Sequence, residues 1–233
     1  MIQLHSMAFA LFPAAEPLNP RFRAGHTKLR LTVDAEPAPN VPDRALQDRL
    51  VAAFPGLARH HCQVQGDGAP RPARARGVVL VDGETTANQA HLLEHLLLEM
   101  LGFLDHVPRL SGVTCAYTSP PERNDIFVEC VDSESGRFAA VVALEAMNAC
   151  LVGDPVSPLY PDVLRCARTI RRQAVGTWPP ARLGRAARIP SDRAQAALEV
   201  LAHARLVEPE PYAMNFSGEP HYRFVGAGGA GRA

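Results

Sequence analysis

The spacing of hydrophobic residues before position 153 changes several times between a helical period and a strand-like alternation. A loop rich in Pro, Gly and Arg is expected over residues 66–77, and a turn over residues 119–124. Because strands and helices do not alternate strictly, the pattern favours an α+β domain. The predicted helices are residues 43–54, 86–103 and 137–151, and the predicted strands are residues 28–33, 78–81, 113–118 and 125–131.

The segment 153–161 contains three prolines in nine residues. Proline restricts its own backbone and that of the residue before it, so this segment predicts a domain boundary. The pattern after it predicts three helices and a β-hairpin, which is the order of a winged helix: residues 162–174, 180–187, 191–204, 206–207 and 221–225. We therefore expect an α+β domain over residues 1–154, a winged-helix domain over 155–226 and a disordered tail over 227–233.

Composition narrows the class of protein. The 233 residues are 47% hydrophobic and 21% charged, which excludes a wholly disordered chain. Residues 155–233 hold eleven Arg against six acidic residues, a net of +5, so residues 1–154 carry −5. No apolar run of 18 residues predicts a membrane span, and the start lacks the basic segment of a signal peptide. Five cysteines without a Cys-x-x-Cys pair indicate the reducing cytoplasm.

The predicted helix 86–103 contains the motif His91-Leu-Leu-Glu94-His95. Two histidines at i and i+4 lie on one helical face, where their imidazoles can converge on one metal ion. Glu94 lies beside that face, placed to act as a general base on a metal-bound water or to ligate in support. The order His-x-x-Glu-His occurs in one class of zinc peptidases. The alternative is that these side chains face solvent or form a polar cluster where two domains meet.

A zinc site needs at least a third protein ligand. The tripeptide His60-His61-Cys62 follows the predicted helix 43–54, and a cysteine thiolate is a strong zinc ligand. His60 or His61 could also reach the site, and Glu99 and Glu129 are oxygen alternatives. The sequence alone leaves this choice open, because the tripeptide can equally be ordinary loop composition.

Four ordered segments of residues 40–152 resemble the N-terminal domain of cyanophycin synthetases. That domain carries a Pro-x-Leu-x-x-His-His-Cys segment, a His-x-x-Glu-His helix, a Val-Val-x-Glu strand and a Gly-Arg-Tyr-Ala helix start, in this order. The corresponding segments here are Phe54–Cys62, His91–Glu99, Ile126–Glu129 and Ser135–Ala139.

In some of these synthetases the domain is a metal-dependent hydrolase that cuts the cyanophycin chain. The resemblance implies metal ligation by Cys62, His91 and His95, with Glu94 as general base. Two departures concern substrate recognition: the family's Gly-Thr-Trp is replaced by Thr86-Ala87-Asn88, and an arginine-containing strand end is replaced by residues 116–119. The family's ATP-using ligase domains have no counterpart in this chain, which therefore cannot be the polymerase.

Three functions follow as hypotheses. The first is a zinc-dependent hydrolase of peptide or isopeptide bonds, with Zn²⁺ as cofactor and a peptide-like substrate or a protein partner. The second is a DNA-binding regulator whose front domain senses a metal or ligand, with Arg193 and Gln195 of the predicted helix 191–204 suited to base edges. The third is a non-catalytic partner subunit. The sequence leaves the substrate and the oligomeric state open.

Overall fold

The computed structural model describes residues 1–37, 41–64, 73–81, 83, 85–107, 109–173, 176–210 and 220–225. It is a mixed structure of helices and antiparallel sheets, compatible with the α+β class predicted from the sequence. The chain divides into two compact units. The first comprises Met1–Glu99, Arg109–Cys130 and Ala143–Val156, and the second comprises Met100–Pro108, Val131–Val142 and Ser157–Ala233.

A four-stranded antiparallel sheet forms one layer of the first unit. Its spatial order is β1 (Ile2–Ala10), β2 (Lys28–Ala35), β6 (Arg123–Glu129) and β5 (Gly112–Ala116). Alternate residues of β2, namely Leu29, Leu31 and Val33, are fully buried, as expected where one face of a strand packs on a core. The register places Thr114 of β5 opposite Ile126 of β6, on this same buried face.

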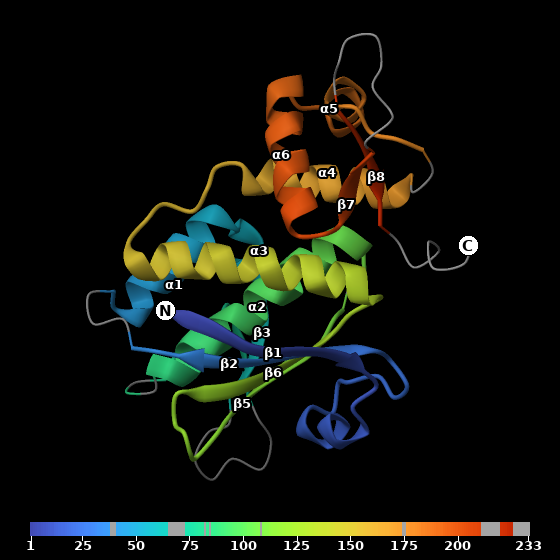
Figure 1. The fold of residues 1–233 in the computed structure, drawn as a ribbon. Coiled ribbons are helices and arrows are strands. Elements are labelled where there is room, and N and C mark those ends of the chain that lie inside the picture. Colours follow the sequence, from blue (N-terminus) through green and yellow to red (C-terminus); the bar gives the residue numbers. More distant parts are fainter. Residues whose placement is uncertain are drawn as a thin grey trace. The chain divides into compact units, whose positions relative to one another are not determined.

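Three helices contribute buried apolar side chains to this unit: α1 (Asp43–Ala53), α2 (Thr85–Asp105) up to Glu99 and α3 (Ser133–Val152) from Ala143. Within the first unit, α2 up to Glu99 and α3 from Ala143 lie over one side of the sheet (Figure 1). The leucines of α2 at positions 92, 93, 96 and 97 are buried and provide its core face. The Asn148 side chain ties α3 to β1 by accepting a hydrogen bond from the Ile2 N–H and donating one to the Ile2 carbonyl.

A small antiparallel ribbon of β3 (His61–Val64) and β4 (Ala73–Arg76) follows the 3₁₀ turn η2 (Pro55–Arg59). The ribbon is anchored through the segment after it: the Gln47 amide of α1 donates to the Val78 carbonyl, and Asn88 of α2 bonds both backbone groups of Val81. Residues 13–18 form a second 3₁₀ turn, η1 (Pro13–Leu18). The ribbon matters because it carries Cys62.

The second unit contains α4 (Tyr160–Arg172), α5 (Pro180–Ala187), α6 (Ser191–His203) and the antiparallel pair β7 (Val207–Glu210) and β8 (His221–Phe224). Its core includes the fully buried Trp178, whose backbone N–H donates to the Tyr222 carbonyl of β8. The Arg171 guanidinium of α4 bridges two carboxylates, Asp105 and Asp132, at 2.7 Å from each.

Most predicted elements are observed with ends displaced by a few residues. The predicted loop 66–77 is wrong at Ala73–Arg76, which forms β4, and its first part, residues 66–72, lies outside the described residues. The predicted strand at 78–81 is also wrong, because these residues form no ladder and instead bond side chains of α1 and α2. Strand β1 was not predicted. The tail 227–233 lies outside the described residues.

Among the described residues, α3 is one helix whose length and composition would let it cross a membrane. Its most apolar window is 61% buried within the protein, and helices of a protein core pass the same test.

Candidate metal centre

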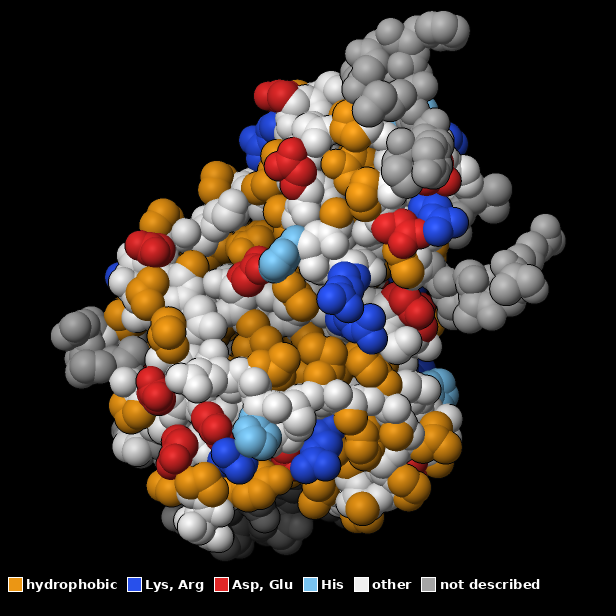
Figure 2. All heavy atoms as spheres, viewed as in Figure 1, with side chains coloured by type: hydrophobic (Ala, Val, Ile, Leu, Met, Phe, Trp, Pro, Cys, Tyr) orange, Lys and Arg blue, Asp and Glu red, His pale blue; other side chains and the backbone are white. Residues whose placement is uncertain are grey.

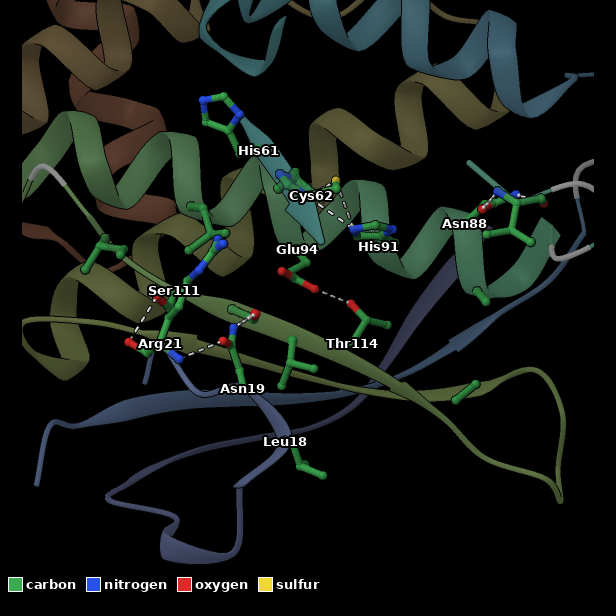
Figure 3. A pocket seen from close by; sticks show the side chains of 18 residues that line it. Leu18, Asn19, Arg21, His61, Cys62, Asn88, His91, Glu94, Ser111 and Thr114 are labelled. Carbon is green, nitrogen blue, oxygen red and sulfur yellow. Dashed lines mark hydrogen bonds between the residues drawn. The ribbon is translucent and has the colours of Figure 1, made fainter. Parts of the chain in front are cut away.

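Three potential metal ligands from two separate elements converge in the first unit. Cys62 lies on β3 and His91 on α2 (Figure 3), and His95 lies one turn beyond His91 on the same helix. The Cys62 Sγ atom is 3.1 Å from His95 Nε2 and 3.6 Å from His91 Nε2, and the two Nε2 atoms are 3.1 Å apart. The three atoms therefore form a nearly equilateral triangle, although Cys62 and His91 are 29 positions apart in the sequence.

The size of this triangle fits a metal ion. Ligand atoms about 2.0–2.3 Å from a tetrahedral zinc ion lie about 3.3–3.6 Å from one another. The observed separations of 3.1–3.6 Å are close to these values. A thiolate and two imidazoles on one face of a tetrahedron would leave the fourth position free for water or substrate. The cluster can thus hold a metal ion.

Burial sets the protonation of the three groups. The Cys62 and His95 side chains are buried and His91 is partly exposed. Burial lowers the pKa of His91, and burial together with the neighbouring His91 and His60 rings lowers the pKa of His95 well below its ordinary value. Both imidazoles are therefore neutral at neutral pH, the form that binds metal. Burial raises the pKa of the Cys62 thiol, against the hydrogen bond that the Val79 N–H donates to its sulfur, so metal binding would release the thiol proton.

Glu94 lies on the same helix and faces the same cavity. Its Oε2 accepts a hydrogen bond of 2.7 Å from the Thr114 hydroxyl of β5 (Figure 3). The carboxyl is buried, and burial raises its pKa to about 7, although the Thr114 hydrogen bond works in the opposite direction. Gly112 gives the carboxyl its space, because a Cβ on Gly112 would lie 2.8 Å from Glu94 Oε1. A carboxyl with a pKa near neutrality can both take up and release a proton.

The cluster and Glu94 line one cavity of about 610 Å³. Glu94 is the one acidic residue of its described lining, and Arg21 is the one Lys or Arg. The Asn19 side chain anchors the loop that carries Arg21 by donating a 2.7 Å hydrogen bond to the Gly112 carbonyl, and the Ser111 hydroxyl donates to the Arg21 carbonyl. The cavity is large enough for a small peptide-like ligand.

The other residues considered as ligands have different positions. His60 and Glu99 lie behind His95: the two Nδ1 atoms of His60 and His95 are 2.9 Å apart, and His60 Nε2 is 2.9 Å from Glu99 Oε2. His61 is exposed, and its ring points away from the cluster (Figure 3). The Glu129 carboxylate is engaged by other groups: it accepts hydrogen bonds from the backbone N–H groups of Arg23 and Ser111 and pairs with the Arg23 side chain.

The two residues considered for reading DNA bases are engaged within the second unit. Arg193 forms an ion pair with the buried Asp162 and donates to the Pro158 carbonyl. The Gln195 amide donates to Glu199 and contacts the Tyr222 hydroxyl. On the face that Figure 2 shows, the Lys and Arg side chains of the described residues lie in small groups near acidic ones. These contacts oppose base recognition by α6.

Sequence reasoning missed Thr114, Gly112 and Asn88. Thr114 and Gly112 belong to strand β5, and their contacts with Glu94 depend on how β5 packs against α2. Nothing in the local sequence pattern marks these two residues. Asn88 is three residues before His91, and this closeness was the one available signal. Neither the models of known protein families nor the curated proteins contain a match to this chain.

Proposed function

We propose that the protein is a zinc-dependent hydrolase of amide bonds in peptides or isopeptides. One observation carries the proposal: a thiol and two neutral imidazoles converge with the spacing of a tetrahedral face, in a cavity that also contains a buried carboxyl of raised pKa. The resemblance of the Cys62, His91, Glu94 and His95 segments to the cyanophycin synthetase N-terminal domain supports the same chemistry.

In this proposal Cys62, His91 and His95 hold the ion. Zinc supplies Lewis acidity, which brings the pKa of a coordinated water to about 7 and polarises a carbonyl. Glu94 Oε1 accepts the proton of the attacking water and delivers it to the leaving amine, while Oε2 stays bonded to the Thr114 hydroxyl. A Glu94 pKa of about 7 suits both steps, since the group must gain and lose a proton in each cycle.

Arg21 favours a substrate class within this function. It belongs to the described lining of the cavity, and the planar guanidinium group of an arginine binds carboxylates through two parallel hydrogen bonds. We therefore propose substrates that carry a carboxylate near the scissile amide. Hydrolysis of a dipeptide with a free carboxylate should be faster than that of the same dipeptide with an amidated carboxyl group.

The test of the function combines metal analysis with a substrate screen. We expect one zinc per purified chain, and cleavage in a mixture of α-linked and isopeptide-linked dipeptides followed by mass spectrometry. Glu94→Gln should retain zinc and lose hydrolysis, whereas His91→Ala should lose both. A wild-type protein without stoichiometric zinc would falsify the proposal, and cleavage that survives Glu94→Gln would contradict the assigned base.

For the second unit we propose a winged-helix-like module that contacts a protein partner, with the whole chain acting in the cytoplasm. Its three helices and hairpin have the required order, and Arg193 and Gln195 are engaged internally. A gel shift at low salt should show no complex with random duplex DNA. A complex that weakens steeply with salt would instead support the regulator hypothesis.

A further inference from the structure

The metal cluster continues into a chain of hydrogen bonds behind His95. His60 lies between His95 and Glu99, with one ring nitrogen 2.9 Å from His95 Nδ1 and the other 2.9 Å from Glu99 Oε2. The three side chains come from two elements: His60 directly follows the turn η2, and Glu99 lies one helical turn beyond His95 on α2. Neither His60 nor Glu99 is one of the three converging ligands.

The hydrogen-bonding groups of Glu99 and His95, at the two ends of this chain of hydrogen bonds, indicate where its protons lie. An ionised carboxylate only accepts hydrogen bonds, so His60 Nε2 donates its N–H to Glu99. With Nε2 donating to Glu99, Nδ1 of His60 is the ring nitrogen available as an acceptor, and the 2.9 Å contact between the two Nδ1 atoms fits a hydrogen bond that His95 donates. The neutral His95 ring, with its proton on Nδ1, presents the lone pair of Nε2 to Cys62 and His91. This is the tautomer that binds metal through Nε2.

The Glu99 carboxylate is held beside His60 by the space that Gly56 leaves for it. A Cβ on Gly56 of η2 would lie 1.6 Å from Glu99 Oε1 and 2.4 Å from Oε2, so the carboxylate occupies the space that a side chain at position 56 would fill. The side chains of His60 and Glu99 are only 18% and 25% exposed, which limits competition from water. The turn η2 and the helix α2 thus lie on two sides of the hydrogen-bonded chain of His95, His60 and Glu99.

We propose that His60 and Glu99 are positioning residues of the metal centre: Glu99 orients His60, and His60 fixes His95 in the tautomer and ring orientation that ligate the ion. The inference rests on the metal-binding part of the proposed function and not on hydrolysis. Loss of such an outer hydrogen-bond partner typically lowers metal affinity 10–100-fold.

Zinc affinity of the full chain, measured by competition with a chromophoric chelator, tests the assignment. His60→Leu should weaken binding about 10–100-fold. His60→Asn should recover most of the loss, because its amide oxygen can take the place of Nδ1 and accept from His95. Glu99→Leu and Gly56→Ala should each weaken binding less than His60→Leu does. Since Glu99 acts through His60, the double variant His60→Leu/Glu99→Leu should bind zinc as His60→Leu alone does.

His61→Leu is the matched control, because this neighbouring ring is exposed and points away, and its zinc affinity should equal that of the wild type. Equal affinity of His60→Leu and wild type, additive losses in the double variant, or no recovery in His60→Asn would each overturn the inference while leaving a zinc hydrolase intact. Thermal unfolding of each variant separates these effects from loss of the fold.

Nitrogen NMR of metal-free, histidine-labelled protein decides the matter even if no zinc binds. The wild type should show His95 with its proton on Nδ1, and His60→Leu should show a mixture of the two tautomers. A wild-type His95 with its proton on Nε2 would refute the proposed role of His60 and Glu99. A failed screen for hydrolysis would affect only the proposed function, because neither readout depends on turnover.

Discussion

The Thr114 hydroxyl donates a 2.7 Å hydrogen bond to Oε2 of Glu94, joining the β5 edge of the sheet to the helix that carries both histidines of the cluster. This bond holds Oε2 in place. The other oxygen, Oε1, lies next to Gly112, where an added Cβ would be 2.8 Å away from it. The position of the proposed base is therefore set by the sheet as well as by its own helix.

Thr114→Val should lower kcat for the dipeptide substrate about 10–100-fold while zinc content stays at the wild-type value. A hydrogen bond to an ionised group contributes about 1.5–3 kcal/mol, and Val keeps the shape without the donor. Steady-state kinetics and metal analysis measure the two quantities. Thr86→Val is the control, since that partly exposed residue donates its hydroxyl to the Pro121 carbonyl and to no other group of the described residues, and it should leave kcat unchanged.

Gly112→Ala should displace Glu94 and reduce kcat at least about 10-fold, because the added Cβ would lie 2.8 Å from Oε1 and 2.9 Å from Cγ. Gly102→Ala, in the same helix as Glu94, is the matched control: its Cβ would find no atom closer than 3.9 Å. That control should stabilise the protein by about 0.5–1 kcal/mol through helix propensity. Equal activities of the two variants would argue against a tightly packed Glu94.

Glu94→Gln should stabilise the metal-free protein in a pH-dependent way. Burial raises the folded-state pKa of Glu94 from about 4.5 to about 7, so the folded chain binds the proton more tightly than the unfolded chain does. The wild type therefore loses stability as the pH rises from 4.5 to 7, whereas the Gln variant has no such loss.

The gain should be absent below pH 4.5 and reach up to about 3 kcal/mol above pH 7. Urea unfolding of chelator-treated protein at several pH values measures it. A difference in unfolding free energy that does not vary with pH would show that burial leaves the Glu94 pKa unshifted.

Zinc should bind more weakly as the pH falls, because burial raises the pKa of Cys62 and the thiol must lose its proton on binding. Competition titrations between pH 6 and 8 in buffers of different ionisation enthalpy would give both the affinity and the proton release. Cys62→Ser should lower affinity strongly and flatten this dependence. Chelation of the wild type should lower its melting temperature, since the ion binds only the folded state.

Arg171→Met should destabilise the second unit by about 3–5 kcal/mol, because it leaves Asp105 and Asp132 facing each other without their shared cation. Burial raises the pKa of Asp105, so the loss should be largest at neutral pH and smaller once this carboxyl is protonated. Urea unfolding measures it. Arg172→Met, at an exposed neighbouring position, should change stability by no more than about 0.5 kcal/mol.

The elements found from the sequence are those whose signal is local. The leucines of α2 repeat at helical spacing, and the same spacing places His91 and His95 on one face. Strand β1 was missed because it is an edge strand whose residues are mostly exposed, so burial imposes little alternation on it. Strand β4 (ARAR) has no apolar residue other than alanine, and only its partner β3 makes it a strand.

The residues of the candidate site likewise divide into those with a local sequence signal and those without one. The two histidines and Glu94 could be named from their spacing, and Cys62 only as one of several choices until the resemblance favoured it. The contact between His60 and Glu99 joins residues 39 positions apart, and that between Glu94 and Thr114 joins residues 20 apart. Such distances depend on how strands and helices pack, which the hydrophobic pattern does not encode.

The sulfur of the cluster comes from a two-stranded ribbon, whereas both nitrogens come from the long helix α2. An ion in this place would join the ribbon directly to α2, whereas the hydrogen bonds of Asn88 with Val81 hold only the segment after the ribbon to that helix. Lifting the ribbon alone removes one ligand of three, a smaller opening than global unfolding. The lifetime of the bound ion would then depend on how often this ribbon opens locally, and metal exchange would proceed through that opening.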